Sequence, residues 1–326
     1  MRVLQVLGDT DADDDGHAAL DLHRALGRLG AEVRTLALTP GRSAGLAATV
    51  PTMGPSAGSI ATHTQLRREQ RWADVVVLRG ERPAACAGMA RVRGGPPVVL
   101  HLTNEVSRWR HQPVPSRALR LAGRSAALVL PCRRDRDVAT RLGVSEDLVH
   151  VVAYGVDPLG VRSDAERSAA RDALGLPADA VVAHVLDGPL AAEVRHEAGR
   201  RGVATTGIES VDDRVVHFGA VEPVDQAELA IAAADVVVAA GPTCGPSWAL
   251  LRAAGAGLAV IASGDVTLAE LVDHDTGWDD LDDAATAGFA ELRRRGAGAA
   301  ARVAERFSAS SSAERWSDVI AGVVER

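Results

Sequence analysis

An acidic loop near the start of the chain holds the first side chains that could do chemistry. Asp11, Asp13, Asp14 and Asp15 follow the apolar run MRVLQVL and precede a helical pattern that begins near Gly16. Clustered carboxylates suit hard cations such as Mg²⁺, and carboxylates at a helix start also cap free backbone amides. The solvated, capping role is the simpler interpretation, so we expect no metal site and no bound cofactor.

His101 is a second candidate, because it ends the apolar run VVLH at residues 98–101. In open α/β sheets, ligands bind beyond the carboxyl ends of the strands, which is where this imidazole would lie. Asn104, Glu105 and Arg108 come just after it and could contact an acceptor molecule or simply begin a helix. For His101 itself, a role in the site and a role in packing both remain open.

Cys244 lies in a Gly/Pro-rich loop, GPTCGP, between an apolar run and a helical stretch that contains Trp248. A thiol becomes reactive where a helix start lowers its pKa, but a small buried residue is the simpler reading. Trp248 could stack on a ring or fill space. The chain has no lysine, which excludes Schiff-base chemistry and a P-loop lysine.

The elements that would position these residues alternate between apolar, strand-like runs and amphipathic helical patterns along the whole chain. One series covers residues 1–155 and a second covers 156–305, with GVD at 155–157 between them. A last amphipathic helix carries Trp316, Ile320 and Val323 on one face. The predicted fold class is α/β, with two Rossmann-like domains and a C-terminal helical segment at 306–326.

Composition restricts the function classes. The chain has 326 residues and a net charge of −7, which gives no basic surface for nucleic acid. Three cysteines without CxxC spacing fit a reducing compartment, so we expect a cytoplasmic protein. The N-terminal residues lack the pattern of a signal peptide, and no apolar run is long enough for a transmembrane segment.

The order and spacing of short motifs resemble the GT-B glycosyltransferases, in particular the group-1 branch that transfers sugars from nucleotide sugars with retention. This resemblance implies two domains facing a cleft, acceptor side first and donor side second, with the terminal helix returning to the first domain. It implies a nucleotide sugar and a glycan or small-molecule acceptor as partners. The motifs are VLQVLG, VVLH at 98–101, GVD at 155–157, ALGLP at 173–177, DGPL at 187–190, VVHFGAV at 215–221, AADVVVAA at 233–240, AGAGLAVIAS at 254–263 and ELVDHDTG at 270–277.

The donor-site positions depart from the family pattern. Where the family has two glutamates that contact the donor's sugar and ribose, this chain has Cys244 and Arg252, with Gly245 in the same loop. Where the family has a glycine pair beside the phosphates, an ungapped alignment gives Asp13 and Asp14. Glu270 matches a glutamate of the family, although a carboxylate at a helix start explains it equally well.

A deletion is the third departure. ALGLPADA at 173–180 runs directly into VVAHVLDGPL at 181–190, so the second domain should lack one βα unit, and the family's arginine–lysine phosphate clamp with it. Two functions follow from these departures. The first is a glycosyltransferase-like protein with degenerate donor motifs. The alternative is a non-catalytic GT-B homologue that binds an active glycosyltransferase as its partner or activator, or binds a carbohydrate.

Overall fold

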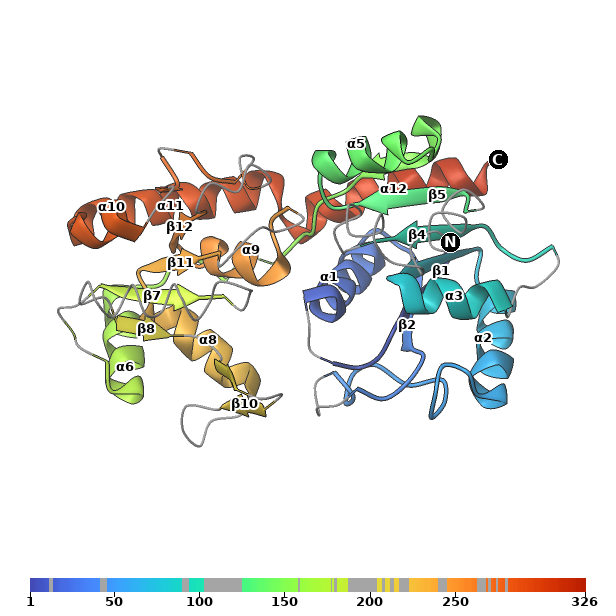
Figure 1. The fold of residues 1–326 in the computed structure, drawn as a ribbon, viewed down its shortest axis with the longest axis horizontal. Helices are drawn as coiled ribbons and strands as arrows, with labels where there is room; N and C mark the ends of the chain where they lie inside the picture. Colours follow the sequence, from blue (N-terminus) through green and yellow to red (C-terminus); the bar gives the residue numbers. More distant parts are fainter. Residues whose placement is uncertain are drawn as a thin grey trace. The chain divides into compact units, whose positions relative to one another are not determined.

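The computed structural model divides the chain into two compact units (Figure 1). Unit 1 is Met1–Gly155 together with Ala309–Arg326, and unit 2 is Val156–Ser308. The residues that the structure describes are 1–11, 14–41, 46–89, 94–102, 125–157, 159–176, 178, 181–186, 204–206, 209–211, 214–216, 223–239, 245–262, 268, 271–273, 275–278 and 281–326. Among them, no helix is long and apolar enough to cross a membrane.

Unit 1 is built on a six-stranded, all-parallel sheet in the order β2-β1-β3-β4-β5-β6. Runs such as VVVLR and ALVL form its strands because they are buried on both faces, as parallel strands require. The strands are β1 (Arg2–Leu7), β2 (Glu32–Ala37), β3 (Val75–Arg79), β4 (Val98–His101), β5 (Ala127–Leu130) and β6 (Val149–Val151).

Helices cover both faces of the unit 1 sheet. Side chains that alternate along β1 divide between two cores: Leu4 packs in one with Leu66 of α2, and Val3 packs in the other with Leu26 of α1 and Trp316 of α12. The C-terminal helix α12 therefore lies beside α1 as part of unit 1. The helical segments are α1 (Asp14–Arg28), α2 (Ile60–Trp72), α3 (Glu81–Met89), α5 (Arg133–Arg141), the short η2 (Glu146–Leu148) and α12 (Ala309–Val324).

Unit 2 has a five-stranded parallel sheet in the order β13-β12-β11-β7-β8. Helix α6 leads to β7, and residues 175, 176, 178 and 181, the part of this connection that the structure describes, form no strand. The sheet strands are β7 (Val182–Val185), β8 (Ala204–Thr206), β11 (Val236–Val238), β12 (Ala259–Ile261) and β13 (Gly277–Trp278). The helices are α6 (Asp164–Leu174), α8 (Pro223–Ala233), α9 (Trp248–Gly255), α10 (Leu281–Thr286) and α11 (Phe289–Arg306).

A strand pair stands apart from the unit 2 sheet. The run RVVHF at 214–218, which reads as one more strand of the alternating series, forms β10 (Arg214–Val216) and pairs antiparallel with β9 (Glu209–Val211). An apolar run of this length has strand propensity in either setting, so local sequence does not decide which sheet it joins.

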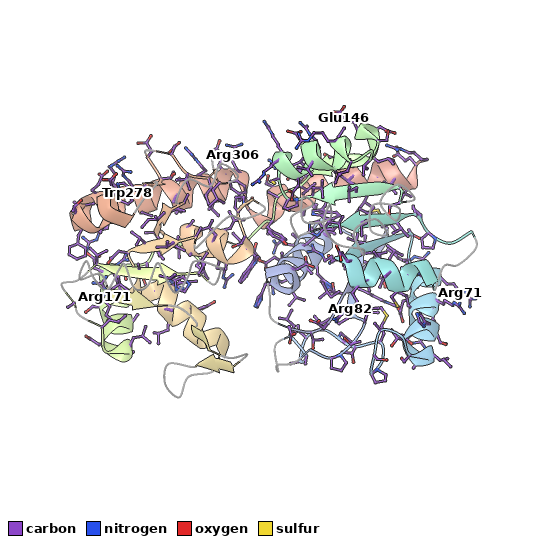
Figure 2. The ribbon with its side chains drawn as sticks, in the orientation of Figure 1. Arg71, Arg82, Glu146, Arg171, Trp278 and Arg306 are labelled. Carbon is purple, nitrogen blue, oxygen red and sulfur yellow. The ribbon has the colours of Figure 1, made fainter. Side chains whose placement is uncertain are left out.

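A buried ion cluster fixes α6 to the amino ends of the unit 2 strands. Asp235 accepts hydrogen bonds from Arg171 (2.5 Å) and from the backbone N–H of Val182 (2.9 Å), and Arg167 lies 3.5 Å away. Both arginines project from α6, where Arg171 is labelled in Figure 2. The carboxylate thus neutralises charge that would otherwise be buried without a partner.

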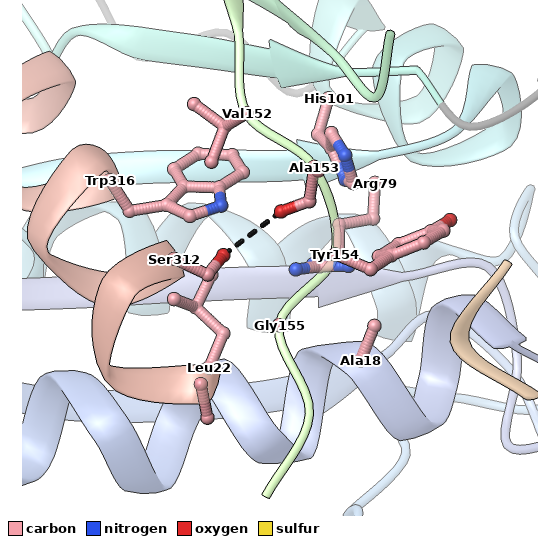
Figure 3. Close-up of a pocket in the computed structure, with 11 residues that line it drawn as sticks. Ala18, Leu22, Arg79, His101, Val152, Ala153, Tyr154, Gly155, Ser312 and Trp316 are labelled. Carbon is pink, nitrogen blue, oxygen red and sulfur yellow. Dashed lines mark hydrogen bonds between the residues drawn. The ribbon is translucent and has the colours of Figure 1, made fainter. Parts of the chain in front are cut away.

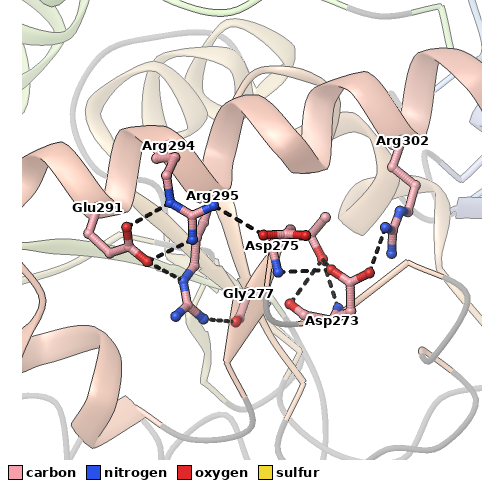
Figure 4. Close-up of polar contacts among 8 residues, drawn as sticks. Asp273, Asp275, Gly277, Glu291, Arg294, Arg295 and Arg302 are labelled. Carbon is pink, nitrogen blue, oxygen red and sulfur yellow. Dashed lines mark hydrogen bonds and ion pairs between the residues drawn. The ribbon is translucent and has the colours of Figure 1, made fainter.

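Helix α11 is held against β13 and the turn before it by a surface network (Figure 4). Glu291 accepts from Arg294 and Arg295, and these guanidinium groups hold the pKa of Glu291 at about 2. Arg302 reaches Asp273 at 2.6 Å. The helix approaches so closely that a Cβ at Gly296 would lie 1.9 Å from the carbonyl oxygen of Gly257, so only glycine fits there.

Candidate functional site

Strand pairing brings two polar side chains together at the carboxyl edge of the unit 1 sheet. Arg79 ends β3 and His101 ends β4, and the parallel register pairs them directly. The N–H of Gly80 donates to the carbonyl oxygen of His101 at 2.8 Å, which fixes the backbone where the strands end. Both side chains are buried, with exposed fractions of 2% and 1%. Two ionisable side chains, Arg79 and His101, thus lie next to each other in the buried interior of unit 1.

Aromatic rings hold His101 on two sides (Figure 3). Its imidazole makes edge contacts with Tyr154, at a centroid distance of 5.9 Å, and with Trp316 of α12, at 5.3 Å. These rings, with Arg79 and Ser312, line a small pocket whose floor is completed by Ala18, Leu22, Val152, Ala153, Gly155 and Ala309. Ring contacts fix the plane of the imidazole and leave its nitrogens to polar partners.

The two ring nitrogens of His101 are buried and have no hydrogen-bond partner among the described residues. A buried polar atom without a partner costs about 1–3 kcal/mol, and most buried polar atoms in proteins have a protein or water partner. Among the described residues, His101 is thus one whose ring nitrogens are both open to a further partner.

Arg79 is locked in place by two neighbours. Its Nε donates to Oε1 of Gln5 at 3.1 Å, and its Nη1 donates to Oδ1 of Asp15 at 2.7 Å. The amide group of Gln5 donates in turn to the carbonyl oxygen of Ala19 and to the hydroxyl of Thr35, so its oxygen must face Arg79. The guanidinium charge beside His101 is thus fixed and is partly balanced by Asp15.

Electrostatics in the pocket favour a neutral imidazole. Burial, and then the positive charge of Arg79, hold the pKa of His101 well below its usual value. Burial raises the pKa of the Asp15 carboxyl, and Arg79 opposes that rise. Asp15 Oδ1 lies 3.8 Å from Nδ1 of His101. A neutral imidazole has one donor and one acceptor nitrogen, so it can both give and take a hydrogen bond at neutral pH.

The last helix closes one side of the pocket. Ser312 of α12 donates from its hydroxyl to the carbonyl oxygen of Ala153 at 3.0 Å, which ties the helix to the segment after β6 (Figure 3). Trp316 follows one turn later and packs on the imidazole. The C-terminal helix therefore contributes wall residues to the pocket as well as core residues to unit 1.

In unit 2, two residues of the predicted donor site are described: Gly245 lies before α9 and Arg252 lies in its last turn. Gly245 is buried and has a backbone φ of +96°, a conformation that favours glycine. Ser247 caps α9 by accepting from the N–H of Leu250 at 3.1 Å. Arg252 pairs with Glu228 of α8 at 2.7 Å, and its guanidinium lies 5.3 Å from the ring centroid of Trp248. The cation at the family's glutamate position is thus bound to a neighbouring helix.

Several predicted site residues lie outside the described part of the chain. These are Asp13, Asn104, Glu105, Arg108, Cys244 and Glu270. Asp14 is the first residue of α1. Among the described residues, no cluster of three or more His, Cys, Asp or Glu side chains could hold a metal ion. Asp15, which we expected in a solvated loop, instead packs against Arg79, because α1 begins above the end of β3.

Sequence reasoning missed the network around His101. Gln5 and Arg79 were visible as single polar residues inside apolar strand runs, RVLQVL and VVVLR. A polar side chain buried in a parallel sheet needs a partner, so each was a signal of a buried network. Ser312 and Tyr154 gave no such signal, because only the fold brings α12 and the segment after β6 to this edge.

The chain is similar to known glycosyltransferases in both sequence and structure. Residues 16–158 match the model of Glycosyltransferase Family 4. No curated protein sequence matches the chain. HepE from Anabaena, solved in complex with UDP and glucose, superposes with a TM-score of 0.73 at 16% identity, covering 99% of this chain and 100% of HepE.

Two further solved structures cover the chain just as fully. Sucrose-phosphate synthase from Thermosynechococcus elongatus gives a TM-score of 0.65 at 14% identity, with 100% of this chain and 99% of that chain covered. The catalytic domain of starch synthase IV from Arabidopsis thaliana, bound to ADP and acarbose, gives 0.66 at 12% identity with 100% coverage of both chains. At these identities the structures establish the fold. Residues 16–158 are thus similar to Glycosyltransferase Family 4, and the chain as a whole has the two-domain GT-B fold of the solved glycosyltransferases.

Proposed function

We propose that this protein is a nucleotide-sugar-dependent glycosyltransferase of the group-1 type whose donor contacts are altered. The observation that carries the proposal is His101, a buried and neutral imidazole with no hydrogen-bond partner among the described residues, which lines a pocket at the carboxyl edge of the unit 1 sheet. That edge is where α/β sheets bind their ligands. In this proposal, His101 makes the hydrogen bond to the sugar that is transferred.

The ligands of similar structures support this substrate class. HepE was solved with UDP-glucose, and starch synthase IV was solved with ADP and acarbose. Proteins of the same fold thus bind a sugar nucleotide in one case and a nucleoside diphosphate with a sugar-like molecule in the other. For this chain we propose a nucleotide sugar as donor and a glycan or small-molecule hydroxyl as acceptor, with no metal ion required.

In this proposal, the pocket residues act on the substrate through hydrogen bonds made by the neutral imidazole. A neutral imidazole can orient a sugar hydroxyl, and a hydrogen bond that strengthens as charge develops on the sugar lowers the barrier to transfer. Arg79 and Asp15 supply fixed opposite charges behind it. Tyr154 and Trp316 exclude water from the imidazole. In this proposal, these residues bind the sugar, orient it and exclude water from it, as the transfer of a sugar from a donor to an acceptor hydroxyl requires.

The donor side should bind weakly in this proposal. Arg252 replaces a carboxylate that would accept hydrogen bonds, and its guanidinium is already paired with Glu228. Asp13 and Asp14 replace the glycine pair, and the chain has no lysine for a phosphate clamp. The second candidate function, a non-catalytic homologue that binds a partner glycosyltransferase or a carbohydrate, is favoured by this same Arg252–Glu228 pair.

Turnover distinguishes the two candidates. The assay measures release of nucleoside diphosphate from UDP-, GDP- and dTDP-sugars at millimolar donor, with and without simple sugar acceptors. We expect release from at least one donor, and a loss of about 100-fold in His101→Leu, since an oriented hydrogen bond to the reacting group is removed. The matched control is His63→Leu. His63 also has a buried ring nitrogen without a partner among the described residues, but it lies on α2 away from the pocket, so this substitution should leave the turnover rate unchanged. Absence of release from every donor would support the non-catalytic candidate.

A further inference from the structure

Asp15 occupies a place from which it can control the imidazole of His101. Its Oδ1 atom lies between two neighbours, 2.7 Å from Nη1 of Arg79 and 3.8 Å from Nδ1 of His101. The second distance is too long for a hydrogen bond, but an approach of about 1 Å brings it into range. Asp15 stands in the first turn of α1 with 18% of its side chain exposed, so its carboxylate has room to move.

The other groups around the imidazole cannot take this role. Arg79 faces it from β3 as a cation with donors alone. Trp316 faces it from α12 and Tyr154 from the segment after β6, both through ring edges. Ser312 of α12 donates its hydroxyl hydrogen to Ala153. Among the described neighbours of His101, Asp15 is thus the acceptor that an N–H of this ring can reach.

We propose that Asp15 is a positioning residue that accepts a hydrogen bond from the Nδ1–H of His101 and thereby keeps Nε2 bare as a hydrogen-bond acceptor. Arg79 holds the carboxylate in line, and Gln5 holds Arg79. The arrangement gives the ring one tautomer before any ligand arrives, because its other nitrogen has no competing partner in the described structure. A sugar hydroxyl would then donate to Nε2, a consequence that rests on the proposed function.

The tautomer can be read directly in the ligand-free protein. Long-range ¹H–¹⁵N correlation of the ¹⁵N-histidine-labelled full chain at pH 7.5 separates a protonated from a bare ring nitrogen, and the His101 signals are those that vanish in His101→Leu. We expect Nδ1 protonated and Nε2 bare in the wild type. The opposite tautomer in the wild type would overturn the proposal, whatever any variant does.

A variant pair isolates the carboxylate. Asp15→Asn should shift His101 toward the Nε2–H tautomer, and Asp9→Asn should leave the His101 signals where they are. Asp9 is a matched control because it also follows β1 and also pairs with an arginine, Arg82, at 3.2 Å. An unchanged tautomer in folded Asp15→Asn would refute the role of Asp15.

Activity provides a separate readout. Asp15→Asn should lower kcat for nucleotide-sugar turnover by about 100-fold while the donor KM changes little, because misplacing an oriented group slows the reaction more than it weakens binding. If the wild-type tautomer and its shift are as expected but no donor is turned over, the proposed function fails and the positioning role stands. A normal kcat in Asp15→Asn would overturn the link between the two.

Discussion

His101 is buried at a cost that packing does not explain. Its two ring nitrogens lack partners in the described structure, whereas an aliphatic side chain of similar volume would have no polar atom to satisfy. Residues kept at a cost in stability are a common feature of functional sites. We propose that the imidazole serves a ligand, and its stability and titration test this against a packing role.

Replacing His101 by leucine tests this directly. His101→Leu should leave the free energy of unfolding unchanged or raise it by about 1 kcal/mol, since removal of the unsatisfied Nε2 offsets the lost ring contacts and the lost Nδ1–Asp15 interaction. Urea unfolding measures the change. A decrease of more than about 1 kcal/mol would mean that the nitrogens find partners in solution, and the packing interpretation of His101 would then hold.

The pH dependence of stability carries the same information. The pKa of His101 is well below 6.5 in the folded chain, so below pH 6.5 the unfolded chain binds a proton that the folded chain does not. The free energy of unfolding therefore keeps the full contribution of neutral His101 above pH 6.5. It decreases as the pH drops from 6.5 toward the pKa of His101 in the folded chain, by up to about 1.4 kcal/mol per pH unit.

The same substitution should remove this slope. The difference between the free energies of unfolding at pH 7.5 and pH 5.5 should be larger in the wild type than in His101→Leu. His23 and His150, whose pKa values burial also lowers, remain in both proteins and contribute equally. Equal losses in the two proteins would show that His101 titrates normally when folded.

At the scale of residues, the sequence indicated His101 but not its setting. The end of the run VVLH places the imidazole at a sheet edge, which strand periodicity predicts well. Its neighbours Asp15, Arg79 and Trp316 come from α1, β3 and α12, and no local pattern relates them. Contacts between residues this far apart depend on sheet order and helix packing, which a single sequence does not specify.

Among the elements, α6 depends most on one buried carboxylate. Asp235→Ala leaves Arg167 and Arg171 buried without their counter-charge, so it should destabilise the protein by about 3–5 kcal/mol. Asp164→Ala, at the exposed start of the same helix, removes a surface pair with Arg293 and should cost about 1 kcal/mol or less. Thermal or urea unfolding of both variants measures the difference. Similar effects of the two substitutions would show that the buried cluster does not hold α6.

Element prediction succeeded where burial dictates the pattern. The runs behind β5 and β11 are continuous and apolar, and those behind β1 and β3 are mostly so, which is typical of strands covered on both faces. The run at 214–218 has the same propensity but pairs outside the main sheet, with β9. Pairing partners are chosen by tertiary contacts, so strand existence was predictable from the sequence and strand placement was not.

At the scale of the whole molecule, the GT-B fold was predictable from motif order although each motif is weak. Identity to the solved structures is 16% or less, yet the chain covers 99% or more of its own length in those superpositions. Hydrophobic periodicity is a property of many residues together, so it can specify a fold at low sequence identity. Donor contacts are single side chains, so we propose that a change such as Arg252 alters what the protein binds while the fold stays intact.

Titration calorimetry with UDP-, GDP- and dTDP-sugars measures whether this GT-B protein has the weakened donor contacts that we propose. Charged hydrogen bonds contribute about 1.5–3 kcal/mol each, so losing two or three moves a micromolar ligand to the millimolar range. We predict dissociation constants of about 1 mM or weaker, with or without Mg²⁺. A dissociation constant of about 10 µM or tighter for any of these donors would contradict the account, and the loss of that affinity in Arg252→Ala would identify Arg252 as the compensating contact.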